Sequence, residues 1–285
     1  MIVLILFMLP AALYAVAWSA AWQTSARLRP EDARSGPAPA ALPPAPQWGL
    51  AAAILLHGVS LAWPWDQGGF HFGFAKALSG MLWIGLVMLW MEGRRAPLAA
   101  MHLLLLPLAA LALILPLAFP GTDFGAVSQR PLFVPHLVMG TLAYGVLMLG
   151  ALQALLMLWA QRDLQRPDRP PANGLLGRVL GGLPPLLVLE RVLFRFIWIG
   201  FGLLLLTTLS GMLFSEEVFG RPFRFEHKTV FSLLSLAFFG VLLAGRVVRG
   251  WRGRIAMRFT LWGFLILLLA YIGTRFVFEV VLQRY

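Results

Sequence analysis

The segment from Phe225 to Arg254 places the strongest constraint on how this chain can fold. It has His227 near its start, continues with about twenty mostly apolar residues and ends in a cluster of arginines. An apolar run of this length is typical of a helix that crosses a bilayer, and arginines beside such a helix usually stay on the cytoplasmic side. A second segment, which starts at His136, has the same design. The sequence therefore predicts two membrane helices that each carry a histidine at the outer end.

Composition extends this interpretation to the whole chain. Of the 285 residues, 60% are hydrophobic and 12% are charged, which is about half the charge of an ordinary soluble domain. We therefore predict an all-α, polytopic membrane helix bundle that forms a single membrane domain, with about eight transmembrane helices and both termini outside. The expected spans are residues 1–23, 48–64, 74–91, 98–119, 134–160, 191–213, 227–249 and 257–281.

Positive charge between the spans predicts which side each connection faces. Fourteen of the 23 lysines and arginines fall in or beside four alternate connections, which we assign to the cytoplasm. Two of these, residues 24–47 and 161–190, are expected to be cytoplasmic linkers. The first span lacks a basic segment before it, so we interpret it as a retained helix, with a cleaved signal peptide as the alternative. Membrane anchoring explains the net charge of +11, so nucleic acid is not an expected partner.

Several kinds of chemistry are excluded or disfavoured by the sequence. The chain has no cysteine, which excludes disulfides, thiolate metal sites and covalent attachment of a c-type haem. It also contains no HExxH, GxSxG or Walker motif. We therefore expect a protein that is not an enzyme.

The candidate ligands are histidines, because ionisable residues inside membrane spans are costly and usually mark functional sites. His136 and His227 start two spans that enter from the outside, so they are expected at similar depth. A helix N-terminus is positively polarised and favours the neutral imidazole that binds metals such as haem iron. His57 is expected within the second span, in its outer half, where an interhelical hydrogen bond is the alternative role. His71 and His102 are expected to be structural.

Two residues on the same helical face as His136 extend the candidate site. Gly140 and Tyr144 follow at i+4 and i+8. A glycine at this position lets either a flat macrocycle or another helix approach the backbone closely, and the residues alone leave both alternatives open.

Basic residues on the predicted outer side supply candidate partners for an anionic ligand. Arg221 and Arg224 lie in the loop before the seventh span, interleaved with phenylalanines, and Arg275 lies in the outer half of the last span. One interpretation is an aromatic and basic lip for a flat anionic ligand, with Arg275 as a propionate clamp. The alternative is local ion pairing with nearby glutamates, including Glu279 one turn after Arg275.

Six sequence pieces, in this order and spacing, resemble the membrane cytochrome c assembly family of the CcsA/CcmC type, and within it the YpjD/HemX branch. They are LHGVSL at His57, HLVMGTLAYGVL at His136, ERVLFRFIWIGFGLLLLTTLSGMLF from Glu190, EHKTVFSLLS from Glu226, GWRGR from Gly250 and LAYIGTRFV from Leu269. The resemblance implies handling of non-covalent b-type haem at the outer face of a bacterial inner membrane, with cytochrome c biogenesis or other inner-membrane proteins as partners. By this resemblance His136 matches the first outward-facing haem histidine of the family, and His57 its first membrane-embedded one. The tryptophan-rich haem loop of the family is replaced here by SEEVFGRPFRFEHK.

Three functional hypotheses follow. The first is a non-enzymatic haem-binding assembly factor in which His136 and His227 are axial ligands, His57 is the substitute partner, and Arg221, Arg224 or Arg275 lies near the propionates. The second is a haem-free membrane scaffold or a regulator of haem biosynthesis. The third is a transporter of haem or another small amphiphile.

Overall fold

A computed structural model describes residues 2–27, 44–62, 71–93, 98–125, 132–165, 174–219 and 227–270. Nearly all of these residues are helical, which confirms the predicted all-α membrane bundle. The helices are α1 (Ile2–Arg27), α3 (Pro44–Ala62), α4 (Phe74–Glu92), α5 (His102–Ala118), α6 (Phe133–Leu164), α7 (Gly174–Gly181), α8 (Leu186–Phe219), α9 (His227–Arg249) and α10 (Arg254–Leu268). A short 3-10 helix, Ala99–Met101, precedes α5, and two short strands, β1 (His71–Phe72) and β2 (Thr122–Asp123), complete the described elements.

Each predicted span overlaps one α-helix. Among the described helices, five are long and apolar enough to cross a membrane: α1, α4, α6, α8 and α9. Helices α3 and α5 are also apolar, but their apolar parts are shorter. The part of the last span beyond residue 270 lies outside the described residues, so the number of eight crossings stays a prediction. The segment expected as a linker, residues 161–190, contains α7 and the first turn of α8. Arg178 of α7 donates to the carbonyl of Trp22 (3.1 Å) and lies over its ring, which docks α7 on the end of α1.

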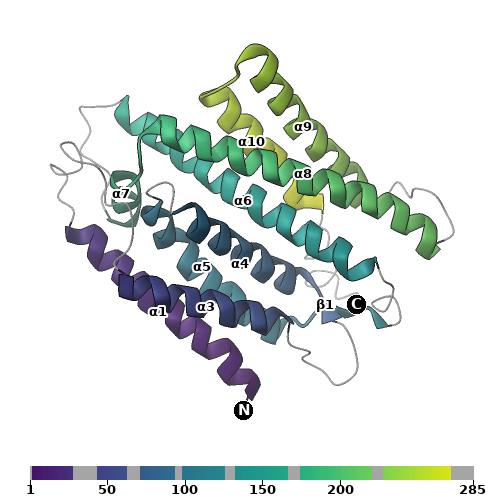
Figure 1. Ribbon diagram of the computed structural model, residues 1–285, viewed down its shortest axis with the longest axis horizontal. Coiled ribbons are helices and arrows are strands. Elements are labelled where there is room, and N and C mark those ends of the chain that lie inside the picture. Colours follow the sequence, from purple (N-terminus) through teal and green to yellow (C-terminus); the bar gives the residue numbers. More distant parts are fainter. Residues whose placement is uncertain are drawn as a thin grey trace.

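Helix α6 is the centre of the bundle (Figure 1). It packs most extensively against α8 and also contacts α4 and α10, while α9 packs against α8 and α10. On the other side of α4, helices α1, α3 and α5 form a second group. The α4–α6 contact is therefore the main seam between the two groups of helices.

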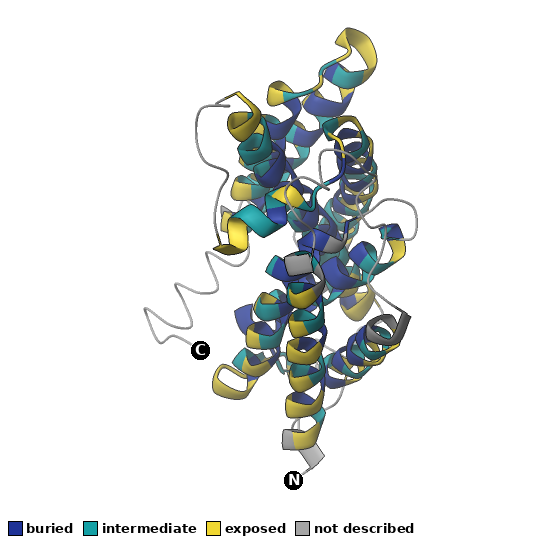
Figure 2. Ribbon diagram, turned by 90° about the vertical axis from the view of Figure 1, so that its left-hand side faces the viewer, coloured by how far each residue is buried: buried dark blue, intermediate teal, exposed yellow. Residues whose placement is uncertain are grey.

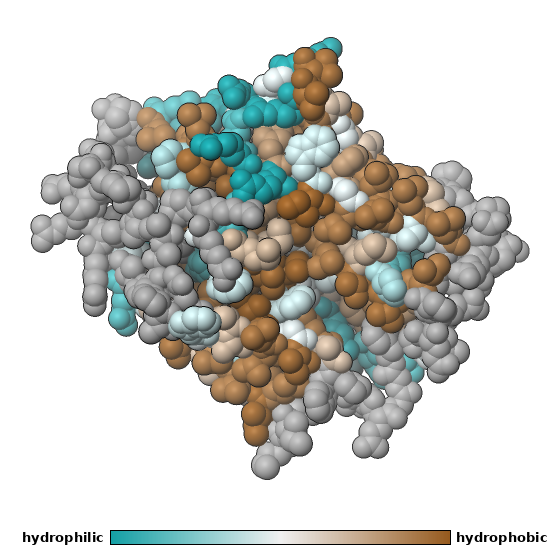
Figure 3. All heavy atoms as spheres, viewed as in Figure 1, coloured by the Kyte–Doolittle hydropathy of each residue, from teal (hydrophilic) through white to brown (hydrophobic). Residues whose placement is uncertain are grey.

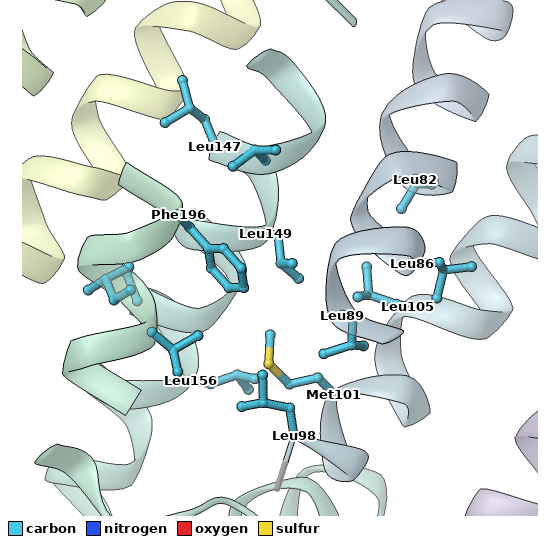
Figure 4. Packing of buried hydrophobic residues seen from close by; sticks show 14 of the residues in the cluster. Leu82, Leu86, Leu89, Leu98, Met101, Leu105, Leu147, Leu149, Leu156 and Phe196 are labelled. Atoms are coloured by element: carbon cyan, nitrogen blue, oxygen red, sulfur yellow. The ribbon is translucent and has the colours of Figure 1, made fainter. Parts of the chain in front are cut away.

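Buried residues pack on both sides of α4 (Figure 4). Leu149 of α6 points toward α4, whereas Leu86 of α4 lies beside Leu105 of α5, and all three are almost completely buried. At the seam, Gly145 of α6 brings the backbones of α4 and α6 close together. A Cβ at this position would overlap the side chain of Ile84 and lie 2.8 Å from the carbonyl oxygen of Met81. A small residue at a helix crossing is the usual way for membrane helices to gain dispersion contacts.

A proline in α5 creates a polar contact inside the other helix group. Pro107 has no N–H, so the carbonyl of Leu103, four residues earlier, loses its partner within the helix. The indole Nε1 of Trp18 in α1 donates to that carbonyl at 3.0 Å. A carbonyl left without a hydrogen bond inside a bilayer costs on the order of several kcal/mol, as does any buried amide group without a partner. The pair therefore ties α1 to α5 at the point where α5 is interrupted.

The outer surface of the bundle is apolar where lipid would contact it. Figure 2 shows buried residues between the helices and exposed residues on their outward sides, and many of the exposed residues are large and apolar, such as Leu55 and Val241. Figure 3 shows hydrophobic residues over the middle of one face and hydrophilic ones along the edge where α8 begins and α9 meets α10. Arg249, Arg252 and Arg254 are exposed in that turn. This distribution agrees with a membrane protein whose arginine-rich end is cytoplasmic.

The opposite end carries a small two-stranded sheet that the sequence did not predict. Strands β1 and β2 pair antiparallel, with His71 opposite Asp123 and Phe72 opposite Thr122. Gly121 has φ 88°, and a Cβ there would lie 2.5 Å from the amide nitrogen of Gly73. Only glycine permits this approach without strain. Lys76 of α4 donates to the carbonyl of His71 (2.8 Å) and holds the two-stranded sheet over the end of α4.

Candidate functional site at the outer end of helix α6

His136 lies in the first turn of α6 and contacts α8. Its backbone N–H donates to the carbonyl of Leu132 at 3.1 Å, so the residue is held by the helix start. Its ring nitrogen Nδ1 is 2.9 Å from the hydroxyl of Ser210 in α8. The next residue, Gly211, has no side chain, and a Cβ there would lie only 3.0 Å from Cε1 of the ring. The half-buried imidazole is therefore held against the backbone of α8.

The start of α9 lies near His136. The Lys228 ammonium is close enough to the imidazole for the two groups to interact electrostatically. His227 immediately precedes Lys228 and is the first residue of α9. Its side chain lies outside the described residues, as do Arg221, Arg224 and Arg275. The start of α9 is thus near enough to His136 for its charge to act on the ring, and the ligand roles of the two predicted outer histidines stay predictions.

Gly140 and Tyr144, the two residues predicted on the His136 face, contact neighbouring helices. A Cβ on Gly140 would lie 3.4 Å from Cγ2 of Thr207, so this glycine faces α8. The hydroxyl of Tyr144 donates to the carbonyl of Leu267 at 2.8 Å and ties α6 to α10. Of the two alternatives left open by the sequence, these contacts agree with helix packing.

His57 is built into a buried hydrogen-bond chain within the other helix group. Its Nδ1 is 3.0 Å from the hydroxyl of Tyr14 in α1, and its Nε2 is 2.9 Å from the hydroxyl of Ser79 in α4. The imidazole is completely buried. Ser79 faces α3, whereas the next residue, Gly80, faces Thr141 of α6. Helix α4 therefore lies between His57 and α6, and the structure does not bring His57 and His136 together.

The remaining two histidines occupy separate places. His71 is in strand β1, opposite Asp123, and His102 is a buried residue at the start of α5. Within the described ranges, no three histidine, aspartate or glutamate side chains are grouped so that they could hold a metal ion. A haem needs fewer protein ligands than a metal ion does, because the porphyrin supplies four of the iron's ligands and the chain supplies only the axial ones.

Two acidic residues that the sequence analysis did not select form ion pairs at the arginine-rich end. Glu190 of α8 accepts from Arg246 at 3.0 Å and from the backbone N–H of Gly253 at 3.3 Å, and Arg252 lies 3.5 Å away. These contacts join α8 to the turn between α9 and α10. Glu92 at the end of α4 pairs with Arg195 of α8 and joins the two helix groups. The sequence does contain a signal for these two residues, because each glutamate lies at the edge of an apolar span.

Ser210 and Gly211 were also missed as partners of His136. Their signal is the run TTLSG, from Thr207 to Gly211, which places small and polar residues within an otherwise apolar span. Such residues typically mark a helix interface or a polar contact in a membrane protein.

The fold and the site together define a polytopic, all-helical membrane protein with a histidine site at one end of its central helix. The family model described as "Cytochrome C assembly protein" matches residues 53–282. The chain therefore belongs to the cytochrome c assembly family, as the sequence resemblance had predicted. Membership supports a haem-related role in the membrane.

Similarity to individual proteins supports the same family assignment. The chain is 31% identical to "Inner membrane protein YpjD" of Escherichia coli (strain K12) over 182 residues, which cover 62% of this chain and 65% of the relative. It is 28% identical to "Cytochrome c biogenesis protein CcsA" of Prochlorococcus marinus (strain MIT 9301) over 155 residues, which cover 50% of each chain. The chain thus spans less than two thirds of the length of these relatives. No solved structure matches it.

The likeness to YpjD and the membrane-spanning helices make this a multi-pass inner-membrane protein. The YpjD-like branch predicted from the sequence is confirmed. The predicted likeness to HemX stays a prediction.

Proposed function

We propose that this protein holds a non-covalent b-type haem near the outer face of the inner membrane, for haem handling or cytochrome assembly and not for catalysis. His136 is one axial ligand and His227 is the other. The observation that carries the proposal is the environment of His136, an imidazole at a helix start that is hydrogen-bonded through Nδ1 and packed on a glycine. Histidines that bind metals almost always have such a partner on the second ring nitrogen.

The charges near this site also fit the proposed ligand. A haem carries two propionates, and Lys228 is a cation that interacts with the His136 ring. Arg221, Arg224 and Arg275 are proposed as further propionate partners because the sequence predicts them on the same side of the membrane. A haem iron held by two imidazoles would suit storage, relay or electron transfer better than oxygen chemistry.

His57 is not needed as an axial ligand in this proposal. Both of its ring nitrogens have partners in α1 and α4, and α4 separates it from α6. We propose instead that it fixes the packing of these helices. Proposed protein partners are cytochrome c biogenesis or other inner-membrane proteins.

Absorption spectroscopy of the detergent-purified protein tests the proposal. We expect a sharp reduced b-type spectrum and a stoichiometric haem content in a pyridine haemochrome assay. His136→Ala should lose most of the haem while eluting from a sizing column like the wild type. His71→Ala, which removes a histidine from strand β1, is the matched control and should keep its haem. A flat spectrum after addition of haem, or full retention of haem by His136→Ala, contradicts the proposal.

A second candidate, a haem-free scaffold or regulator, is favoured by one observation. Three residues predicted to touch the cofactor, His57, Gly140 and Tyr144, have helix-packing contacts. The same spectrum separates the two candidates, since a scaffold takes up no haem. Co-purification with other inner-membrane proteins, undiminished in His136→Ala, would then support the scaffold.

A further inference from the structure

The side chain of Ser210 has two polar neighbours but only one proton. Its Oγ is 3.0 Å from the carbonyl oxygen of Thr207, one turn earlier in α8, and 2.9 Å from Nδ1 of His136. A carbonyl oxygen has no proton to offer, so the contact with Thr207 is a hydrogen bond only if the serine donates. Serines within helices commonly donate to the carbonyl three or four residues earlier.

Once the serine proton is used in this way, the other contact has a fixed direction. Oγ must accept from the imidazole, and Nδ1 must therefore carry the proton. In a neutral imidazole the second nitrogen, Nε2, then has the lone pair. The opposite arrangement would leave two oxygens 3.0 Å apart with no proton between them, which is a repulsive contact.

We infer that Ser210 is a positioning residue that sets His136 in the Nδ1–H tautomer and directs the Nε2 lone pair to the metal. The ligand in this inference rests on the proposed function, whereas the tautomer does not. Gly211 completes the arrangement, because a side chain there would meet Cε1 of the ring, at 3.0 Å from its Cβ. The hydrogen bond fixes the tautomer, and the glycine lets the ring lie close enough to α8 to make it.

The tautomer can be measured in the haem-free protein. Histidine is labelled with nitrogen-15, and the His136 signals are identified by their loss in His136→Gln. We expect the Nδ1–H form in the wild type, a mixture or the Nε2–H form in Ser210→Ala, and return of the Nδ1–H form in Ser210→Thr. Thr208→Val is the matched control, because the Thr208 hydroxyl donates to the carbonyl of Leu204 within its own helix. An Nε2–H wild type, or an unchanged Ser210→Ala, overturns the inference.

Haem titration of the same proteins tests the consequence for ligation. Loss of a partner of a metal-bound histidine typically weakens binding about 10–100-fold. We expect Ser210→Ala to lose about tenfold in haem affinity, with Thr208→Val unchanged and Ser210→Thr restored. Wild-type affinity in Ser210→Ala overturns the positioning role. If the wild type itself takes up no haem, the proposed function fails, and the nitrogen-15 result alone decides whether Ser210 sets the tautomer.

Discussion

The packing of α6 against its neighbours predicts different effects for the same substitution at three of its glycines. A Cβ on Gly145 would overlap Cγ2 of Ile84 and lie 2.8 Å from the carbonyl oxygen of Met81. On Gly150 the nearest atom, Cβ of Phe196, would be 3.7 Å away, and on Gly140 the nearest, Cγ2 of Thr207, would be 3.4 Å away. Gly145→Ala should therefore separate α6 from α4, and the other two should be tolerated.

Two opposing terms set the size of the effect. Alanine improves helix propensity over glycine by up to about 1 kcal/mol in each variant. At Gly145 the new methyl meets a β-branched side chain with few alternative rotamers and a backbone carbonyl that cannot move alone. Forcing an extra methyl into a well-packed core costs about 1–3 kcal/mol, occasionally more. We expect Gly145→Ala to lower the free energy of unfolding by about 1–2 kcal/mol, and Gly150→Ala to leave it unchanged or raise it slightly.

Unfolding by sodium dodecyl sulfate in mixed micelles, followed by circular dichroism, measures these differences. The three variants change the same atoms in the same helix, so each is a control for the others. Gly140→Ala also tests the two roles of that glycine, because loss of haem with unchanged stability would indicate that a macrocycle approaches it. If Gly145→Ala is as stable as Gly150→Ala, the close α4–α6 approach is wrong.

Three further substitutions test individual contacts by the same titration. Glu190→Ala removes the carboxylate that binds Arg246 and should cost about 1–3 kcal/mol, less than for a fully buried pair because that arginine is partly exposed; Glu190→Gln should recover part of the loss. Tyr14→Phe removes a partner of buried His57 and should cost about 1–2 kcal/mol. Trp18→Phe leaves a proline-freed carbonyl of α5 unpaired and should cost about 1 kcal/mol, less than the full penalty because the unfolded state in the membrane also finds partners for such groups. Wild-type stability in any variant contradicts the corresponding contact.

Much of the fold was predictable because the length of an apolar run and the charge beside it are local properties. The expected start of α6 at residue 134 differs from the observed start, Phe133, by one residue, and α9 was expected at its observed bounds, 227–249. The two-stranded sheet was not predictable, because two-residue strands leave no alternating pattern to recognise. Nor was α7, a short helix that contacts α1 through Arg178 and Trp22.

The candidate site was predictable only in part. A histidine at the start of each of two long spans indicates depth in the membrane, and the start of α9 does lie near His136. Ser210 could not be assigned to His136, because the two residues are 74 positions apart and meet only through the α6–α8 contact. Glu190 likewise meets Arg246 across α8 and α9.

By itself, the sequence determined that this protein is a membrane helix bundle, where its long helices run and which of their ends carry histidines. The tertiary structure alone decided what each helix face contacts. His57 is hydrogen-bonded to Tyr14 and Ser79, and Gly140 faces α8. The physical reason is that lipid tails are as apolar as a protein core. Membrane helices are therefore hydrophobic on all sides, and their sequence carries little periodicity to define rotation. Rotation is set instead by close packing at glycines and by interhelical hydrogen bonds, which exist only once the helices have met.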